Sequence, residues 1–271
     1  YFAICVDAET GRILHNKKLF HSDNPEPLGN SINCYASPSP VIEEGRVYAH
    51  VGTYGTACLD GKTAEVLWQR TDIPCRHYRG PGSSPMLWES TLVLTMDGVD
   101  VQYVLAVDAS TGKTLWKTDR TADFKDLGPD GKPKRAGDFR KAYSTPIVAL
   151  TGGKRQLRGA GAKAAYGYDI ETGKRVSSIP ARLTCSLAVS PDARLLAAGT
   201  TITKGRTASG GVRLWNLENR KLMFEKQGLK ERRPAVAFGP KGRFLAAETG
   251  SGAEQGRGTG RAGRCVGLRG C

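Results

Sequence analysis

Three segments of the sequence carry a tyrosine, and two of them add arginine, histidine or lysine, which can bind anions or peptide groups. They span residues 33–40, 75–85 and 139–146, and each ends at a proline. Tyrosine offers an aromatic face and a hydroxyl, while arginine, lysine and protonated histidine donate hydrogen bonds to anionic or carbonyl oxygens. The candidate ligand-binding residues are therefore Tyr35, His77, Tyr78, Arg79, Arg140, Lys141 and Tyr143. The alternative is that these tyrosines pack inside the fold and that the cations are solvated.

The residue types that usually perform catalysis or bind metals show no comparable grouping. The four histidines, at positions 15, 21, 50 and 77, have no nucleophile motif beside them. The seven cysteines form no Cys-x-x-Cys pair and have no histidine at metal-ligand spacing. We expect buried, unreactive thiols, but a disulfide between Cys58 and Cys75, or one involving Cys34, also fits an oxidising compartment. We predict no catalytic residue and no metal ligand.

The candidate residues must be positioned by a repeated element. A short apolar run, an aspartate, four turn residues and a second run recur at Asp7, Asp60, Asp108 and Asp169. Aspartate at this place accepts hydrogen bonds from backbone amides two or three residues on, and glycine supplies the positive φ of the hairpin. Each copy therefore predicts two antiparallel strands. In the second copy Ala64 replaces the glycine, so we expect a looser turn there.

A second recurring element precedes three of these hairpins. It is a hydroxyl residue followed by proline, at Ser39-Pro40, Ser84-Pro85 and Thr145-Pro146. Proline can begin a strand where no ladder N–H is required. One full repeat then reads as four strands, over residues 40–42, 46–51, 55–60 and 65–70. Four antiparallel strands are the unit of a β-propeller, so we predict an all-β, incomplete propeller of about five blades. Residues 119–138 interrupt the pattern and predict an exposed loop.

Aromatic residues recur on the outer strands of the predicted blades. Trp68 and Trp116 stand eight residues after their turn aspartates, where an indole can stack against the neighbouring blade. His15 and Ser177 occupy the equivalent positions of the other two copies. We predict that Trp68, Trp116 and a third tryptophan, Trp215, dock one blade on the next.

These repeats resemble the pyrroloquinoline-quinone-like (PQQ-like) β-propeller family, whose blades carry Asp-x-x-Thr-Gly-x-x-x-Trp. The resemblance covers about residues 1–178 and implies an extracytoplasmic protein, because most of the family lies there. The family includes quinoprotein dehydrogenases and outer-membrane assembly lipoproteins. Membership of the dehydrogenase group would imply about eight blades, a bound Ca²⁺, a catalytic Asp and commonly two adjacent cysteines. This sequence has no two adjacent cysteines. PQQ and Ca²⁺ are therefore expected only under the alternative of a quinone-dependent oxidoreductase.

The pattern changes after residue 178. The runs 186–199, 211–217 and 235–247 resemble WD-repeat blades over about 185–250, with Trp215-Asn216 where that family has Trp-Asp. We therefore divide the chain into PQQ-like blades (1–178), WD-like blades (179–252) and a Gly/Arg-rich tail (253–271). The tail cannot bury enough apolar surface to order itself, so we expect it to be disordered.

Composition narrows the function. The net charge of +14 is uneven, since residues 1–118 sum to −3, and the basic residues are scattered through turns and the tail. Nucleic-acid binders gather cations on one face, so we expect no nucleic-acid partner. No run approaches the about 20 apolar residues of a membrane helix. We predict a non-catalytic scaffold that binds an unknown protein or peptide partner outside the cytoplasm. Its unclosed blade edges could also pair with those of other copies and produce oligomers. A cytoplasmic WD-type interaction module is the second alternative.

Overall fold

The computed structural model describes the whole chain except residues 30–32, 152, 181–183, 205–206, 233 and 249–271. The predicted tail, 253–271, therefore lies outside the described residues. The chain forms two compact units, which are described separately. Unit 1 comprises Tyr1–Ile147 with Glu171–Lys174, and unit 2 comprises Val148–Ile170 with Arg175–Cys271. The boundary that we predicted near residue 178 stays a prediction.

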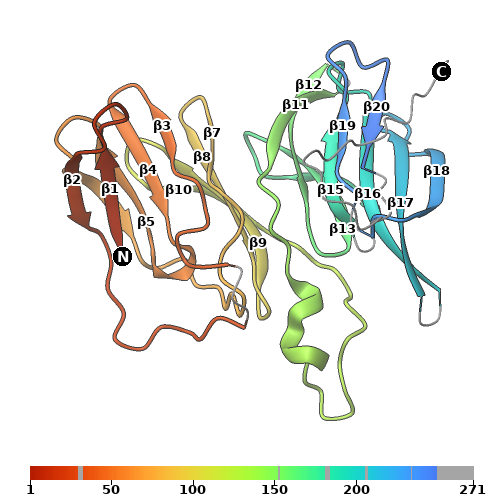
Figure 1. The fold of residues 1–271 in the computed structure, drawn as a ribbon, viewed down its shortest axis with the longest axis horizontal. Coiled ribbons are helices and arrows are strands. Elements are labelled where there is room, and N and C mark those ends of the chain that lie inside the picture. The colour runs from red at the N-terminus through yellow and green to blue at the C-terminus, as the bar shows by residue number, and fades with distance from the viewer. Residues whose placement is uncertain (30–32, 152, 181–183, 205–206, 233, 249–271) are drawn as a thin grey trace, which may run out of the picture. The chain divides into compact units, whose positions relative to one another are not determined.

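The described residues of the first half form three antiparallel sheets (Figure 1). The first sheet has two strands, β1 (Phe2–Val6) and β2 (Ile13–Lys18). The second has four, β3 (Val41–Glu43), β4 (Arg46–His50), β5 (Thr56–Asp60) and β6 (Val66–Arg70). The third also has four, β7 (Met86–Trp88), β8 (Thr91–Asp97), β9 (Gln102–Asp108) and β10 (Thr114–Asp119). A single 3₁₀ turn, η1 (Gly52–Tyr54), follows β4.

The later strands form three further sheets. Two have four strands each, β11 (Ile147–Thr151), β12 (Lys154–Ala160), β13 (Ala164–Asp169) and β14 (Arg175–Pro180), then β15 (Thr184–Val189), β16 (Leu195–Lys204), β17 (Thr207–Asn216) and β18 (Leu222–Leu229). The last has two strands, β19 (Val236–Phe238) and β20 (Leu245–Ala247). Consecutive strands pair with each other in every sheet, as in propeller blades. Four full blades and two half blades confirm the predicted incomplete propeller.

Apolar side chains between successive sheets make the core. In unit 1, Tyr48 and Cys58 of the second sheet pack with Leu94 and Leu105 of the third. In unit 2, Trp215 is buried among side chains that include Ala165 of the preceding sheet. Because neighbouring sheets within a unit bury apolar side chains against each other, much of the folding energy comes from contact between blades.

The aspartate turns have the hydrogen bonds that their sequence specifies. The Asp108 carboxylate accepts from the N–H groups of Ser110 and Thr111 at 3.1 and 2.8 Å. Asp7 and Asp60 make the equivalent bonds. The turn at Ala64 is not looser, because it keeps these bonds and places Ala64 at φ 57°. Left-handed alanine costs about 1 kcal/mol, which the bonds offset.

Candidate binding surface

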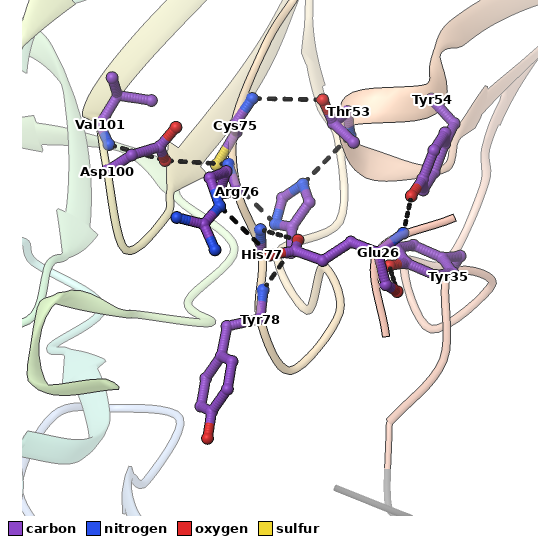
Figure 2. Close-up of polar contacts among 10 residues, drawn as sticks. All are labelled: Glu26, Tyr35, Thr53, Tyr54, Cys75, Arg76, His77, Tyr78, Asp100 and Val101. Atoms are coloured by element: carbon purple, nitrogen blue, oxygen red, sulfur yellow. Dashed lines mark hydrogen bonds and ion pairs between the residues drawn. The ribbon is translucent and has the colours of Figure 1, made fainter. Parts of the chain in front are cut away.

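The segments that link one blade of unit 1 to the next gather the candidate ligand-binding residues. The second link, residues 71–85, is fixed by a carboxylate from the first link (Figure 2). Glu26 Oε2 accepts hydrogen bonds from the backbone N–H groups of His77 (2.9 Å) and Tyr78 (3.1 Å). Arg76 Nε lies 3.5 Å from the other oxygen, Oε1. One acidic side chain therefore holds the backbone of the neighbouring link.

The His77 ring points into the protein rather than toward a ligand. Its exposed fraction is 3%, and its Nε2 accepts a hydrogen bond from the N–H of Thr53 at 3.1 Å. Burial, with smaller contributions from Lys141 and His50, lowers the pKa of His77 to about 3. The imidazole is therefore neutral near pH 7, and its role in the described residues is to close the turn η1.

Tyr35 also has a packing role. Its ring contacts Tyr54 edge-on at 4.7 Å between centroids, and Tyr54 stacks on Tyr1 at 4.9 Å. The Tyr35 hydroxyl donates to the carbonyl of Glu26, while the Glu26 N–H donates to the Tyr54 hydroxyl at 2.6 Å. Burial raises the pKa of Tyr35. The aromatic group thus supports the segment that carries the Glu26 carboxylate.

Lys141 is buried, although we expected it at a surface. Its ammonium lies 3.5 Å from the carbonyl of Gly80 and 5.2 Å from the centroid of the Tyr143 ring. Burial lowers the pKa of Lys141, and nearby acidic groups, including Asp97 and Glu26, oppose that shift. The predicted site residues therefore form two layers, in which His77 and Lys141 lie inside and Tyr143 lies outside.

Two arginines fix the third link, which is an insertion of residues 119–146. Arg79 forms a bidentate ion pair with Asp138, at 2.6 and 3.1 Å. Within the insertion, Arg140 binds both oxygens of Asp126 at 2.9 Å. The predicted exposed loop therefore has an ordered interior, with a buried Asp126 and a 3₁₀ segment, η2 (Lys134–Arg140). The insertion extends beyond the strand ends of unit 1 (Figure 1).

The outer part of the insertion exposes apolar side chains. Leu127, Phe139 and Tyr143 are 56%, 42% and 41% exposed. The same segment exposes charged residues of both signs, Asp123, Lys125, Asp130, Lys132 and Lys134. Of the seven predicted site residues, Tyr143 is exposed, His77 and Lys141 are buried, and the other four have intermediate exposure. Sequence reasoning missed Glu26, Asp126 and Asp138, because a lone acidic residue has no local pattern that names its partner.

The predicted docking tryptophans lie between blades. Trp68 Nε1 donates to the carbonyl of Ala109, in the turn of the next sheet, at 2.8 Å. Trp116 lies against Gly173, so closely that a Cβ there would approach the indole to 2.5 Å. Trp215, on β17, packs with Ala165 and Ile179 of the preceding sheet. The pre-proline hydroxyls also connect blades, since Ser39 N–H donates to Ser84 Oγ and Ser84 N–H to Thr145 Oγ1, both at 2.9 Å.

Metal and disulfide chemistry can be assessed for the part of the chain that is described. Within it, no group of three or more His, Cys, Asp or Glu side chains could hold a metal ion. The described residues thus offer no Ca²⁺ site that would fit a quinone cofactor. Cys5, Cys34, Cys58 and Cys75 are free thiols, and burial raises the pKa of Cys58 to about 11. No helix of the described residues is long and apolar enough to cross a membrane.

Together, the four-stranded sheets and their turn motif are those of β-propeller blades. Residues 3–118 match the family model described as outer membrane protein assembly factor BamB. This match and the structural neighbours support the PQQ-like β-propeller repeat family, which confirms that resemblance. The WD-like resemblance of residues 185–250 stays a prediction. Among curated proteins, no sequence matches the chain.

Solved structures show the same fold at low identity. BamB from Moraxella catarrhalis has a TM-score of 0.60 at 20% identity, over 98% of this chain and 71% of that one. The Dos1 propeller has a TM-score of 0.51 at 11% identity, over 75% and 50% of the two chains. Quinohemoprotein alcohol dehydrogenase from Comamonas testosteroni has 0.50 at 11%, over 90% and 48%. The chain therefore spans at most half the length of the last two proteins.

Proposed function

We propose that this chain is a non-catalytic β-propeller scaffold that binds a protein segment at the insertion of residues 119–146. The observation that carries this proposal is the combination of an ordered interior with exposed apolar side chains. Leu127 and Phe139 are exposed although the segment is held by two bidentate arginine–aspartate pairs. Exposed apolar groups on an ordered protrusion are typical of an interaction site.

The ion pairs support binding because they reduce its entropic cost. A loop that is already ordered loses less conformational freedom when a partner docks on it. The Arg140–Asp126 pair is well shielded, with side-chain exposures of 17% and 5%, and the Arg140 guanidinium also lies 5.4 Å from the Phe124 ring. The insertion therefore presents Leu127 and Phe139 from a pre-organised backbone.

The exposed side chains suggest the chemistry of the partner. Besides Leu127 and Phe139, the insertion exposes lysines (Lys125, Lys132 and Lys134) and aspartates (Asp123 and Asp130), so a partner segment with apolar residues among charged residues of both signs would be complementary. We place this interaction in an extracytoplasmic compartment, by analogy with the outer-membrane assembly factor whose family model matches residues 3–118. Oligomerisation through open blade edges is part of the same proposal.

Site-specific photocrosslinking in the native host tests the binding surface. A photoreactive phenylalanine analogue replaces Phe139 or Leu127, and we expect each to give a discrete covalent adduct with one protein. The same analogue at Ile42, which is 72% exposed on β3, is the matched control and should give no such adduct. Mass spectrometry of the adduct identifies the partner, and fractionation of the cells shows its compartment.

The contrary result is equally clear. Absence of an adduct at both Leu127 and Phe139, or the same adducts at Ile42, would reject the insertion as the binding surface.

The oxidoreductase alternative is tested separately, by adding PQQ and Ca²⁺ to the purified chain and recording its absorbance and its alcohol-oxidising activity. Quinone-dependent activity would reject a purely binding role.

A further inference from the structure

A buried arginine crosses the sheet of β11–β14 in unit 2. Arg158, on β12, is 6% exposed, and its Nη1 donates to the hydroxyl of Ser177, on β14, at 2.7 Å. Gly167 lies between them on β13, as the register partner of both residues. A Cβ at Gly167 would lie 2.6 Å from Nη1. Glycine therefore leaves the room that the guanidinium occupies.

The arginine lies on the side of its sheet that faces the next sheet of unit 2. Ala165 and Ile179 lie two residues along β13 and β14 from the residues that Arg158 crosses, so their side chains point to the same face. Both pack with Trp215 of β17. The Arg158 guanidinium is therefore close to an apolar contact between sheets, where a charge without a partner is strongly destabilising.

The charge of Arg158 has no counter-ion among the described residues. Its Nε–H is buried without a hydrogen-bond partner there, and its guanidinium contacts no carboxylate. Burial, with a smaller contribution from the charge of Arg220, lowers the pKa of Arg158 to about 10, so the group is still charged at pH 7. A water molecule would satisfy the Nε–H but would leave the charge uncompensated.

A second guanidinium is bound next to the first. Arg220, in the exposed turn between β17 and β18, donates from Nη2 to the carbonyl of Val176 at 2.9 Å. Val176 directly precedes Ser177, so two consecutive residues of β14 bind the two arginines. Arg220 likewise has no acidic partner in the part of the chain that the structure describes. Two cations are thus held together although they repel each other.

The hydroxyl of Ser177 adds a third donor to this group. Its oxygen accepts from Arg158, which leaves its proton to be donated elsewhere. Within the described ranges, no acceptor receives that proton. Two positive charges, three kinds of donor and no carboxylate are the chemistry of an oxyanion site, because guanidinium groups bind the oxygens of phosphates and carboxylates in pairs.

We infer that Arg158, Ser177 and Arg220 bind a doubly charged tetrahedral oxyanion, either free phosphate or the phosphate group of a small monoester. Arg158 binds it from the buried side, Arg220 binds it from the solvent side, and the Ser177 hydroxyl donates to a further oxygen. A phosphate carries between 1.5 and 2 negative charges near pH 7, about as much as the two arginines offset. These residues belong to unit 2 and the insertion to unit 1, so the site is independent of the proposed function.

Calorimetric titration of the full chain with inorganic phosphate, at constant ionic strength, tests the site. We expect one saturable site per chain. Arg158→Met keeps an apolar stem but removes the guanidinium, and it should weaken binding at least about tenfold. Arg213→Met is the matched control, because it also removes one positive charge from a strand of unit 2, and Arg213 is already paired with Glu225. It should bind phosphate like the native chain.

Arg220→Gln keeps the test decisive if Arg158→Met does not fold, because the Arg220 side chain is exposed. It should weaken phosphate binding about two- to fivefold. Three results would each overturn the inference: no saturable binding to the native chain, the same loss of affinity in Arg158→Met and Arg213→Met, or native affinity in Arg220→Gln.

Other anions identify the class and the source of the ligand. Acetate should bind at least about tenfold more weakly than phosphate, since it carries one charge. Tighter binding of acetate would contradict a doubly charged ligand. Glycerol phosphate distinguishes the two sources. If it competes with phosphate in the native chain, the site accepts a monoester. If only phosphate binds, the ligand is the free ion, and the oxyanion site is supported in both cases.

Discussion

At the scale of single residues, the links between blades depend on groups far apart in sequence. Glu26 binds the backbone of residues 51 and 52 positions away, and Arg79 pairs with an aspartate 59 positions away. Each contact gives a hydrogen-bond partner to polar groups that lose their bonds to water on folding. The chemistry of these side chains is therefore mostly committed to holding the links in place.

The buried His77 makes stability depend on pH. Its pKa of about 3 lies below the usual value of 6.5, so the unfolded chain takes up the proton first as the pH falls. The stability associated with neutral His77 is complete above pH 6.5 and is lost progressively toward pH 3. His50, with a pKa lowered by burial to about 4, acts in the same direction. We expect the free energy of unfolding to fall between pH 6 and 4.5.

The variant His77→Gln isolates the contribution of this residue. Glutamine retains an acceptor for the Thr53 N–H but does not titrate, so the pH dependence should weaken by up to about 1.4 kcal/mol per pH unit. Urea unfolding of both proteins at pH 6.0, 5.2 and 4.5 measures the two slopes, and the carboxylates, which begin to titrate at the lowest of these pH values, contribute to both proteins alike. If the variant kept the native slope, protonation of His77 would not be the cause.

At the scale of the blade, the glycine of the turn has two separable roles. Gly11 and Gly112 share φ 71°, but only Gly112 lies beneath a tryptophan. Alanine at Gly11 should cost about 1 kcal/mol from backbone strain alone. Alanine at Gly112 should cost about 1–3 kcal/mol more, because its Cβ also displaces Trp68.

Denaturant unfolding of the two variants measures this difference directly. Trp68→Ala in the Gly112→Ala background is the control, since it removes the ring that the Cβ would displace. The extra cost of alanine at Gly112 should then disappear. Similar unfolding free energies for Gly11→Ala and Gly112→Ala would show that the Trp68 contact adds nothing.

The sequence predicted the blades well because their signals are local. The expected strands 46–51 and 55–60 differ from β4 and β5 by one residue each. Asp60 and Pro40 act through backbone groups a few residues away, so their effect is visible in a short window. The burial of Lys141 and the pairing of Arg79 with Asp138 have no such local signal. They depend on which links the stacked blades bring together. His77 and Lys141 are therefore buried where a surface position was expected, and ligand binding by the predicted residues stays a prediction.

At the scale of the whole molecule, the two-stranded sheet β1–β2 exposes apolar side chains on both of its strands. Ile13 and Leu14 of β2 are exposed as well as Phe2, Ile4 and Val6. Exposed apolar strands with an open edge promote self-association. We therefore expect the isolated chain to associate as its concentration rises.

A charge on β1 should suppress this association. Ile4→Lys places a cation on the exposed strand, where it costs little stability but disfavours strand-to-strand contact. Static light scattering over a range of concentrations should show a lower apparent mass than for the native chain. Ile42→Lys is the control, because Ile42 is also an exposed apolar residue but lies in the complete sheet of β3–β6. Equal association by Ile4→Lys and the native chain would assign the effect to another surface.

The pre-proline hydroxyls have a consequence for how such repeats can be recombined. The Ser39 N–H donates to the Ser84 hydroxyl, and the Ser84 N–H donates to the Thr145 hydroxyl. The start of each inner strand is therefore positioned by a hydroxyl of the next blade. A blade transplanted from another repeat protein would fit here only if it brought serine or threonine before its first proline. The residue before that proline would then indicate whether two blades are compatible, before their apolar cores are compared.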